Sequence, residues 1–204
     1  RPTTLWYPSA GWDFRPLGYL MPAYQERLEL DVPTPELLEA ELRLVGLLFG
    51  LDRNGLVDLY PANDFDTPKD AFDAFYGDAV FVCPTRSFLS AVAPFTETRA
   101  YHFSRSAWFL DYLGAYHAHE LGYVFGSLAV LYGAEDQALS QAMQRSWVSA
   151  ANQAPSVEGE PWPLFGDGVD GGRWAGFGVP LQTAETGVHD AYCDWFDAED
   201  WQAY

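Results

Sequence analysis

The sequence has few basic residues and no long apolar run. Eleven lysines and arginines stand against 29 aspartates and glutamates, which gives a formal net charge of −18. Phosphate backbones and anionic lipid surfaces would repel such a chain, so binding to nucleic acid or to an anionic membrane is excluded. No stretch approaches the roughly 20 apolar residues that a membrane-spanning helix needs. We therefore expect no membrane span.

Residues that bind metals are also sparse. The chain has two cysteines and four histidines, and none of them stands in a Cys-x-x-Cys or His-x-x-x-His pattern. We therefore expect no metal site, and no cofactor is predicted. The sequence also has no Asn-x-Ser/Thr sequon and gives no sign of glycosylation.

The composition is that of a packed globular protein of about one domain. Of the 204 residues, 49% are hydrophobic and 17% are aromatic, which excludes disorder. The chain begins at Arg1 rather than at a methionine, and no signal-peptide pattern follows. Two interpretations remain open: a processed product, or the C-terminal part of a longer polypeptide.

Local signals predict many helices and few strands. Thr34-Pro35 and Thr67-Pro68 each combine an N-cap residue with proline at the first helical position. The expected helices cover about residues 35–50, 53–60, 67–76, 78–93, 135–151 and 188–202. The alternating segment Arg99–Phe103 is the one obvious strand. Residues 1–30 are expected to be loops with one short strand, 152–172 a surface loop, and 173–181 one or two short strands. Because a lone strand is not stable in water, we expect part of an α/β layer fold whose other strands lie elsewhere.

The most informative segment surrounds His117. It reads Gly-Ala-Tyr-His-Ala-His-Glu-Leu-Gly-Tyr-Val-Phe-Gly over residues 114–126. This segment resembles the one that carries the catalytic histidine in type-B carboxylesterases and cholinesterases. The resemblance implies that His117 is a general base, although a lone histidine is more often structural. Glu120 matches the glutamate of the motif, where it would hold the local turn, form a nearby hydrogen bond, or act as a helix-N-terminal acid.

Other landmarks follow in the order of the same family, from about residue 35 to residue 195. They are Leu59-Tyr60-Pro61, the segment 78–84, Tyr101-His102-Phe103, Ser146-Trp147, Trp162-Pro163 and Cys193-Asp194-Trp195. The resemblance implies that residues 1–204 form one C-terminal segment of an α/β-hydrolase fold, helix-rich with few strands. It also implies a disulfide between Cys83 and Cys193, where two free thiols are the alternative. A disulfide would indicate an oxidising compartment, either secreted or periplasmic.

Two parts of a serine esterase are missing from this chain. The nucleophile pattern Gly-x-Ser-x-Gly does not occur, and neither does a glycine-rich oxyanion loop. An upstream segment or a separate chain would have to carry the serine. Leu17 aligns with the acid of the triad, and its side chain cannot accept a hydrogen bond from an imidazole. Asp13 is the first candidate substitute and Asp111 the second.

Three functional hypotheses result. The leading one is a carboxylic ester hydrolase segment that supplies His117 for a small-molecule ester. The second is a non-catalytic, cholinesterase-like binding module without a complete triad. The third is a divergent product with a fold of its own. In each case we expect His102 and His189 to be structural, and His119 to be a neighbour of the base and not the base itself.

Overall fold

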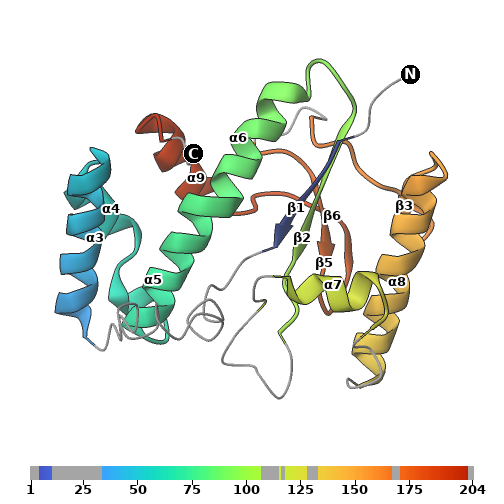
Figure 1. Cartoon of the computed structure of the whole chain (residues 1–204), viewed down its shortest axis with the longest axis horizontal. Helices are drawn as coiled ribbons and strands as arrows, with labels where there is room; N and C mark the ends of the chain where they lie inside the picture. The colour runs from blue at the N-terminus through green and yellow to red at the C-terminus, as the bar shows by residue number, and fades with distance from the viewer. Residues whose placement is uncertain are drawn as a thin grey trace.

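The centre of the molecule is a four-stranded sheet with helices on both faces (Figure 1). The computed structural model describes residues 34–106, 115, 118–127, 133–166 and 171–201, together with the backbone of 5–10. The strands of this sheet stand in the order β1 (Leu5–Ala10), β2 (Thr98–Phe103), β5 (Trp174–Phe177) and β6 (Gln182–Glu185). β1, β2 and β5 are parallel, and β6 runs antiparallel to β5. A small hairpin pairs β3 (Ser156–Val157) with β4 (Glu160–Pro161).

Helices cover both faces of the sheet. The described helices are α3 (Pro35–Phe49), α4 (Arg53–Leu59), the 3-10 turn η1 (Ala62–Asp64), α5 (Pro68–Gly77), the π-helical turn η2 (Asp78–Val82), α6 (Cys83–Val92), α7 (His119–Val124), α8 (Ala134–Ala151) and α9 (Asp190–Ala198). Leu89 of α6 packs with Ala100 on one face of the sheet. Leu139 and Met143 of α8 pack with Tyr101 on the other face. None of the described helices is both long enough and apolar enough to cross a bilayer.

The two Thr-Pro signals start helices as predicted. Thr34 Oγ1 accepts a hydrogen bond from the Leu37 N–H at 3.3 Å, and Thr67 Oγ1 accepts one from the Asp70 N–H at 3.2 Å. α3 ends at Gly50, whose φ of 75° is a left-handed conformation that glycine adopts without a steric penalty. Short-range capping chemistry therefore sets the bounds of these helices.

Several expectations from the sequence were wrong in detail. The predicted helices 67–76 and 78–93 form one unbroken run, because η2 continues α5 directly into α6. The final helix covers only Asp190–Ala198, since the backbone is left-handed at His189 and again at Asp200. The segment 152–172 is more than a surface loop. It contains the hairpin, and Trp162 is buried and donates its indole N–H to the Ala100 carbonyl at 3.0 Å.

The sheet also holds more strands than the one that the sequence made obvious. β5 lies at 174–177, where the sequence predicted one or two short strands, but β6 begins just after that range. All four residues of β5 are buried, so the alternation that marks a half-exposed strand is missing. The described strands therefore already pair into a sheet within this chain.

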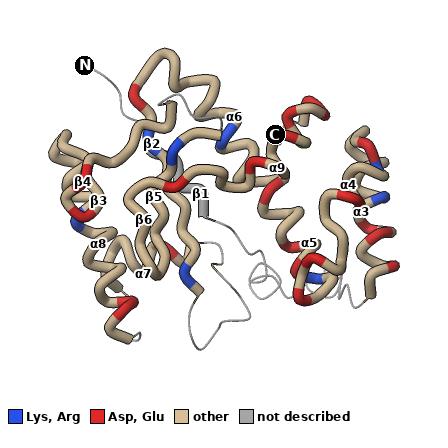
Figure 2. Tube along the Cα trace, turned by 180° about the vertical axis from the view of Figure 1, so that it is seen from behind, with Lys and Arg blue, Asp and Glu red and all other residues tan. Residues whose placement is uncertain are grey.

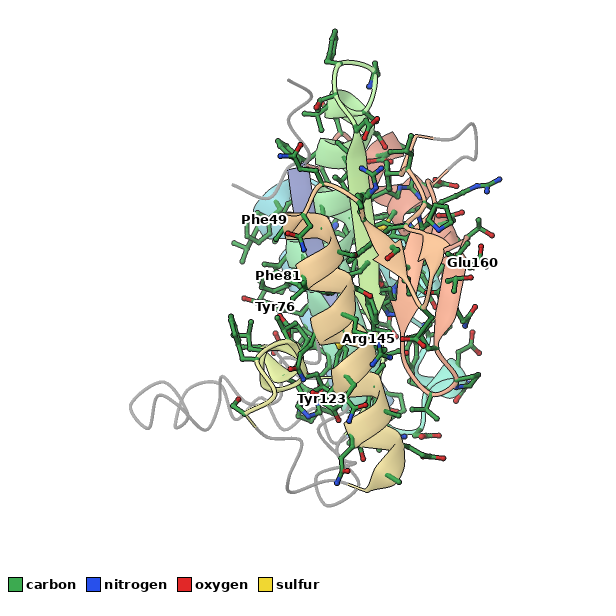
Figure 3. All side chains as sticks on the ribbon, turned by 90° about the vertical axis from the view of Figure 1, so that its right-hand side faces the viewer. Phe49, Tyr76, Phe81, Tyr123, Arg145 and Glu160 are labelled. Atoms are coloured by element: carbon green, nitrogen blue, oxygen red, sulfur yellow. A yellow bond between two sulfur atoms is a disulfide. The ribbon has the colours of Figure 1, made fainter. Side chains whose placement is uncertain are left out.

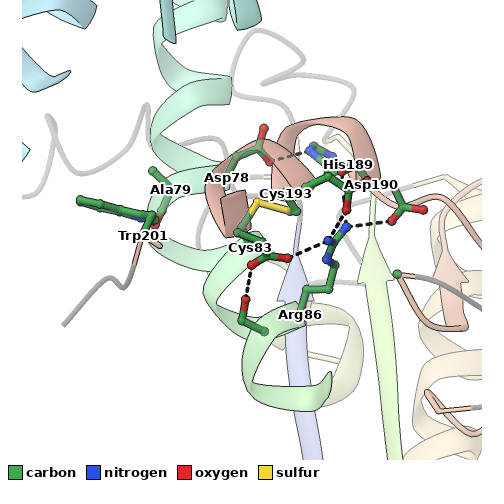
Figure 4. The surroundings of a disulfide bond; sticks show 12 residues. Asp78, Ala79, Cys83, Arg86, His189, Asp190, Cys193 and Trp201 are labelled. Carbon is green, nitrogen blue, oxygen red and sulfur yellow. Dashed lines mark hydrogen bonds and ion pairs between the residues drawn. A yellow bond between two sulfur atoms is a disulfide. The ribbon is translucent and has the colours of Figure 1, made fainter. Parts of the chain in front are cut away.

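A disulfide ties α6 to α9. Cys83 and Cys193 are bonded, with their Cα atoms 4.9 Å apart and both side chains buried, which confirms the pairing that the resemblance implied. Beside the bridge, Arg86 pairs with Asp190 at 3.3 Å, with Asp197 at 2.8 Å and with Asp194 (Figure 4). Figure 2 shows acidic residues along α3, α5 and α9, and Arg86 offsets the charge of three of those on α9. Covalent and ionic links therefore hold α9 at the same place.

Removing the bridge should strongly destabilise the fold. The two cysteines are 110 residues apart, and closing a loop of that length stabilises a protein by about 4–5 kcal/mol in the chain-entropy model. We expect the double variant C83S/C193S to lose about this free energy of unfolding in urea denaturation. The native chain with a reductant should behave like the variant. Equal unfolding midpoints with and without the bridge would contradict the account.

Candidate active site

The histidine motif continues into α7, which begins beside the C-terminal end of β2. Phe103 is the last residue of β2 and His119 is the first of α7; their rings meet edge to face with centroids 5.6 Å apart. Tyr123, one turn along α7, packs against both rings at 5.1 and 5.4 Å. All three side chains are buried. The part of the motif that follows His117 therefore lies at the edge of the parallel strands where α/β folds place their functional groups.

A buried network holds α7 in this position. Arg105 lies two residues past β2, and its Nε donates to Asp136 Oδ1 at 2.7 Å. The Tyr123 hydroxyl donates to the same oxygen at 2.9 Å. The Ser140 hydroxyl donates to the Tyr123 carbonyl at 2.8 Å. The chain after β2, α7 and the first turns of α8 are thus joined by charge-assisted and neutral hydrogen bonds.

The protonation of this network follows from its geometry. Burial alone would raise the pKa of Asp136, but the hydrogen bonds from Arg105 and Tyr123 outweigh it and lower the pKa below its ordinary value. The hydrogen bond to Asp136 in turn raises the pKa of Arg105. The pair is therefore ionised at neutral pH.

Ala118, which directly follows His117, makes a sharp turn. Its φ is 65° and its ψ is 9°, in the left-handed region that residues other than glycine rarely adopt. The resembling family motif has glycine or alanine at this position, and both have a small side chain or none. α7 starts at the next residue. The backbone thus turns sharply between the histidine and the helix that follows it.

His119 is a neutral, buried side chain. It is 1% exposed, and burial lowers its pKa to about 4, although a hydrogen bond with the Arg105 backbone acts in the opposite direction. An imidazole enclosed between Phe103 and Tyr123 cannot exchange protons readily with a substrate. This agrees with the sequence-based expectation that His119 is a neighbour of the base and not the base itself.

Glu120 is buried in the first turn of α7. Only 3% of the residue is exposed, and burial raises the pKa of its carboxyl group. The pKa of Tyr101 on β2 is raised by burial and, second, by the charge of Glu120, so the two groups face the same region. This position suits an acid at a helix N-terminus, one of the alternatives from the sequence. Its role in the motif stays a prediction.

His102 and His189 belong to a second cluster near the disulfide. His102 Nδ1 lies 3.3 Å from Glu185, and His189 Nδ1 lies 2.5 Å from Asp78 Oδ1. Burial alone would lower the pKa of His189, but the hydrogen bond and charge of Asp78 outweigh it and raise the pKa. The hydroxyl of Tyr60 donates to the other oxygen of Asp78 at 2.9 Å. These contacts support structural roles, and sequence reasoning missed the Asp78–His189 pair because its members lie far apart in the chain.

Three residues named from the sequence cannot be placed in this arrangement. His117, Asp13 and Asp111 lie outside the described residues, as does Leu17. Their roles stay predictions. Among the described residues, no cluster of His, Cys, Asp or Glu has the geometry to hold a metal ion.

The family model of the carboxylesterase family matches residues 52–173, which is more than half of the chain. The chain belongs to the carboxylesterase family. The matched range contains both His117 and Glu120. None of the curated proteins compared with the chain matches it.

Solved structures show the same fold. A PNB esterase superposes with a TM-score of 0.59 at 24% identity, over 78% of this chain and 33% of its own. A thermophilic PNB esterase gives 0.61 at 21% identity, over 95% of this chain and 38% of its own. This carboxylesterase-family chain therefore forms part of an α/β-hydrolase fold and spans about a third of the length of these relatives.

Burial of His119 should make the stability depend on pH. Its folded pKa of about 4 lies below the ordinary value of 6.5, so between these values the unfolded chain binds a proton that the folded chain does not. Stability should fall by up to about 3 kcal/mol as the pH drops from 6.5 to 4. Unfolding of the native chain and of H119Q in urea at several pH values measures this contribution. In H119Q, this pH-dependent loss of stability should be absent.

His189 provides the control of opposite sign. Because its folded pKa is raised, its contribution is complete below the unfolded value and is lost as the pH rises through the folded value. H189Q should therefore remove stability mainly at low pH. If H119Q instead lost as much stability as the native chain between pH 6.5 and 4, that result would contradict the assignment of His119 as neutral and buried.

The ion pair between Arg105 and Asp136 should stabilise the fold much more than the exposed pair between Arg105 and Glu135. The Asp136 side chain is 4% exposed, so D136N would leave Arg105 without its buried partner and should lower the free energy of unfolding by about 3 kcal/mol. Glu135 lies 3.5 Å from the same guanidinium but is 67% exposed, and E135Q should cost less than about 1 kcal/mol. Denaturant titrations of both variants measure the difference. Equal losses would rule out Asp136 as the brace of α7.

Proposed function

We propose that this chain supplies His117 as the catalytic base of a serine hydrolase that acts on small-molecule carboxylic esters. Two findings support the proposal. The chain belongs to the carboxylesterase family, and the matched residues include the motif. The main structural support is the contact between Phe103 and His119, because it brings the residues just after His117 to the C-terminal edge of β2.

The nucleophilic serine and the oxyanion donors come from outside these 204 residues, on an upstream segment or a separate chain. The serine oxygen attacks the ester carbonyl while His117 accepts the hydroxyl proton. The same imidazole then gives this proton to the departing alcohol. Water repeats the sequence on the acyl-enzyme and releases the carboxylic acid. Asp13 is the proposed acid that orients the imidazole.

The described residues contribute by holding this base in place. The Arg105–Asp136–Tyr123 network fixes α7, and Ala118 turns the backbone between α7 and His117. A displacement of about 1 Å in a catalytic group can cost roughly a hundredfold in rate. These are positioning roles and involve no contact with the substrate.

The disulfide supports a location outside the reducing cytosol. A structural disulfide such as Cys83–Cys193 persists in oxidising compartments. A secreted or periplasmic enzyme is therefore part of the proposal.

A non-catalytic, cholinesterase-like binding module is the second candidate. Leu17 favours it, since this residue aligns with the acid of the triad and cannot accept a hydrogen bond. A protein of this kind would have the same fold but would not hydrolyse esters.

The test is to combine this chain with the upstream portion of its protein and to assay a short-chain nitrophenyl ester. Alone, the chain should be inactive, because it lacks a nucleophile and oxyanion donors. In the assembled protein, H117Q should lower kcat by about 10³-fold or more, since the serine then has no base. The matched control is H102Q, which removes a histidine paired with Glu185 and should leave kcat near the native value.

The outcomes separate the two candidates. If Asp13 orients the base, the single variant D13N should also lower kcat, as H117Q does. An assembled complex that elutes as one species, carries the serine and still hydrolyses no ester would favour the binding module. Full activity in H117Q would refute the assignment of the base.

A further inference from the structure

Two arginines, Arg99 and Arg173, border one cleft near the N-terminal end of the sheet. β2 and β5 are parallel, and Ala100 is paired with Trp174. Arg99 and Arg173 directly precede this pair in the chain, and both line the same cleft. Like charges that lie close together repel one another. In a chain with 11 basic and 29 acidic residues, two arginines in one cleft call for a physical reason.

The two guanidinium groups are not equally satisfied. Arg99 donates from Nε to the Trp162 carbonyl at 3.2 Å and pairs through Nη1 with Glu97 at 3.2 Å. Arg173 Nε is buried and has no hydrogen-bond partner. Within the part of the chain that the structure describes, the Arg173 side chain makes no ion pair either. A buried donor on a charged group without an acceptor is costly, so an acceptor from outside the chain would stabilise it.

Both arginines line one cleft of about 610 Å³. One wall is apolar and comes from Pro161 of β4 and the segment after it, with Trp162, Pro163 and Leu164. The other comes from β6, with Thr183 and Ala184. Glu160, labelled in Figure 3, also borders the cleft, and it forms no ion pair with either arginine among the described residues. The cleft thus combines a cationic end with an apolar wall.

This cleft is distinct from the proposed ester site. Arg99 lies near the start of β2, whereas His119 contacts Phe103 at its end. Parallel strands place their starts and ends at opposite edges of the sheet. A ligand in the cleft would therefore not occupy the catalytic edge, and its binding does not depend on esterase activity.

We propose that the cleft binds an organic carboxylate with an apolar body. The planar fork of a guanidinium matches the two oxygens of a carboxylate. One carboxylate between Arg99 and Arg173 supplies the acceptor that Arg173 Nε lacks and offsets the repulsion between the two cations. The apolar body lies along the wall that contains Trp162 and Leu164. Glu97 occupies only Arg99, so Arg173 provides the open half of the site.

The test is a calorimetric titration of the full chain with benzoate, in a buffer free of carboxylates and phosphate. The native protein should bind benzoate saturably, and R173Q should weaken binding by roughly tenfold or more, because a charge-assisted hydrogen bond is lost. R145Q is the matched control. It removes the same charge from an exposed arginine on α8 that pairs with Glu158, and it should bind like the native protein (Figure 3).

Thermal unfolding separates binding from a purely structural role. Without a ligand, R173Q should be at least as stable as the native chain, since the substitution removes a charged group whose buried Nε has no acceptor among the described residues. Benzoate should raise the Tm of the native chain and of R145Q but not that of R173Q. A clear loss of stability in ligand-free R173Q would mean that Arg173 is structural, and would overturn the proposal.

Two further probes test the chemistry of the ligand. Benzyl alcohol has the apolar body without the charge and should not bind. Inorganic phosphate has the charge without the apolar body and should bind more weakly than benzoate. Benzoate binding that is absent, or equal in the native protein and R173Q, would refute the site. Phosphate that binds as tightly as benzoate would refute the apolar part of the assignment.

Discussion

The packing of α7 against the end of β2 is the contact on which the functional interpretation depends. Phe103, His119 and Tyr123 enclose one another, and Arg105 reaches across them to Asp136 on α8. Hydrophobic burial supplies most of the attraction, and the ion pair selects one orientation of the short helix. A helix of six residues is not stable in isolation, so its position comes from this packing.

A second core supports the sheet from its other face. Its buried members come from α3, α4, α5, η2, α6 and α9, and they pack around the disulfide. Tyr60 stacks with Tyr192 at 5.0 Å and donates to Asp78, which also holds His189. α6 lies between this cluster and the strands, since Leu89 packs with Ala100 of β2. The bridge and the ionic links at α9 therefore stabilise the layer on which the sheet rests.

Features with a local cause could be predicted from the sequence, and features with a long-range cause could not. The Thr-Pro caps and the alternation in β2 act over a few residues, and the family resemblance indicated the disulfide. β5 gave no alternating signal because both of its faces are covered. In the candidate site, the motif was visible as a string of letters, but its anchoring by Arg105 and Asp136 depends on residues 31 positions apart. The cleft that Arg99 and Arg173 share likewise depends on segments that lie far apart in the chain.

The central claim is that His117 is the group whose ionisation controls the hydrolysis of an ester. The most direct measurement compares two titrations of the assembled protein: the pH dependence of kcat/KM, and the NMR titration of the His117 ring, assigned by its absence in H117Q. For a general base in the free enzyme the two must report the same pKa. The account predicts that they coincide and that kcat/KM rises as His117 loses its proton. A His117 titration that differs clearly from the kinetic one would contradict it.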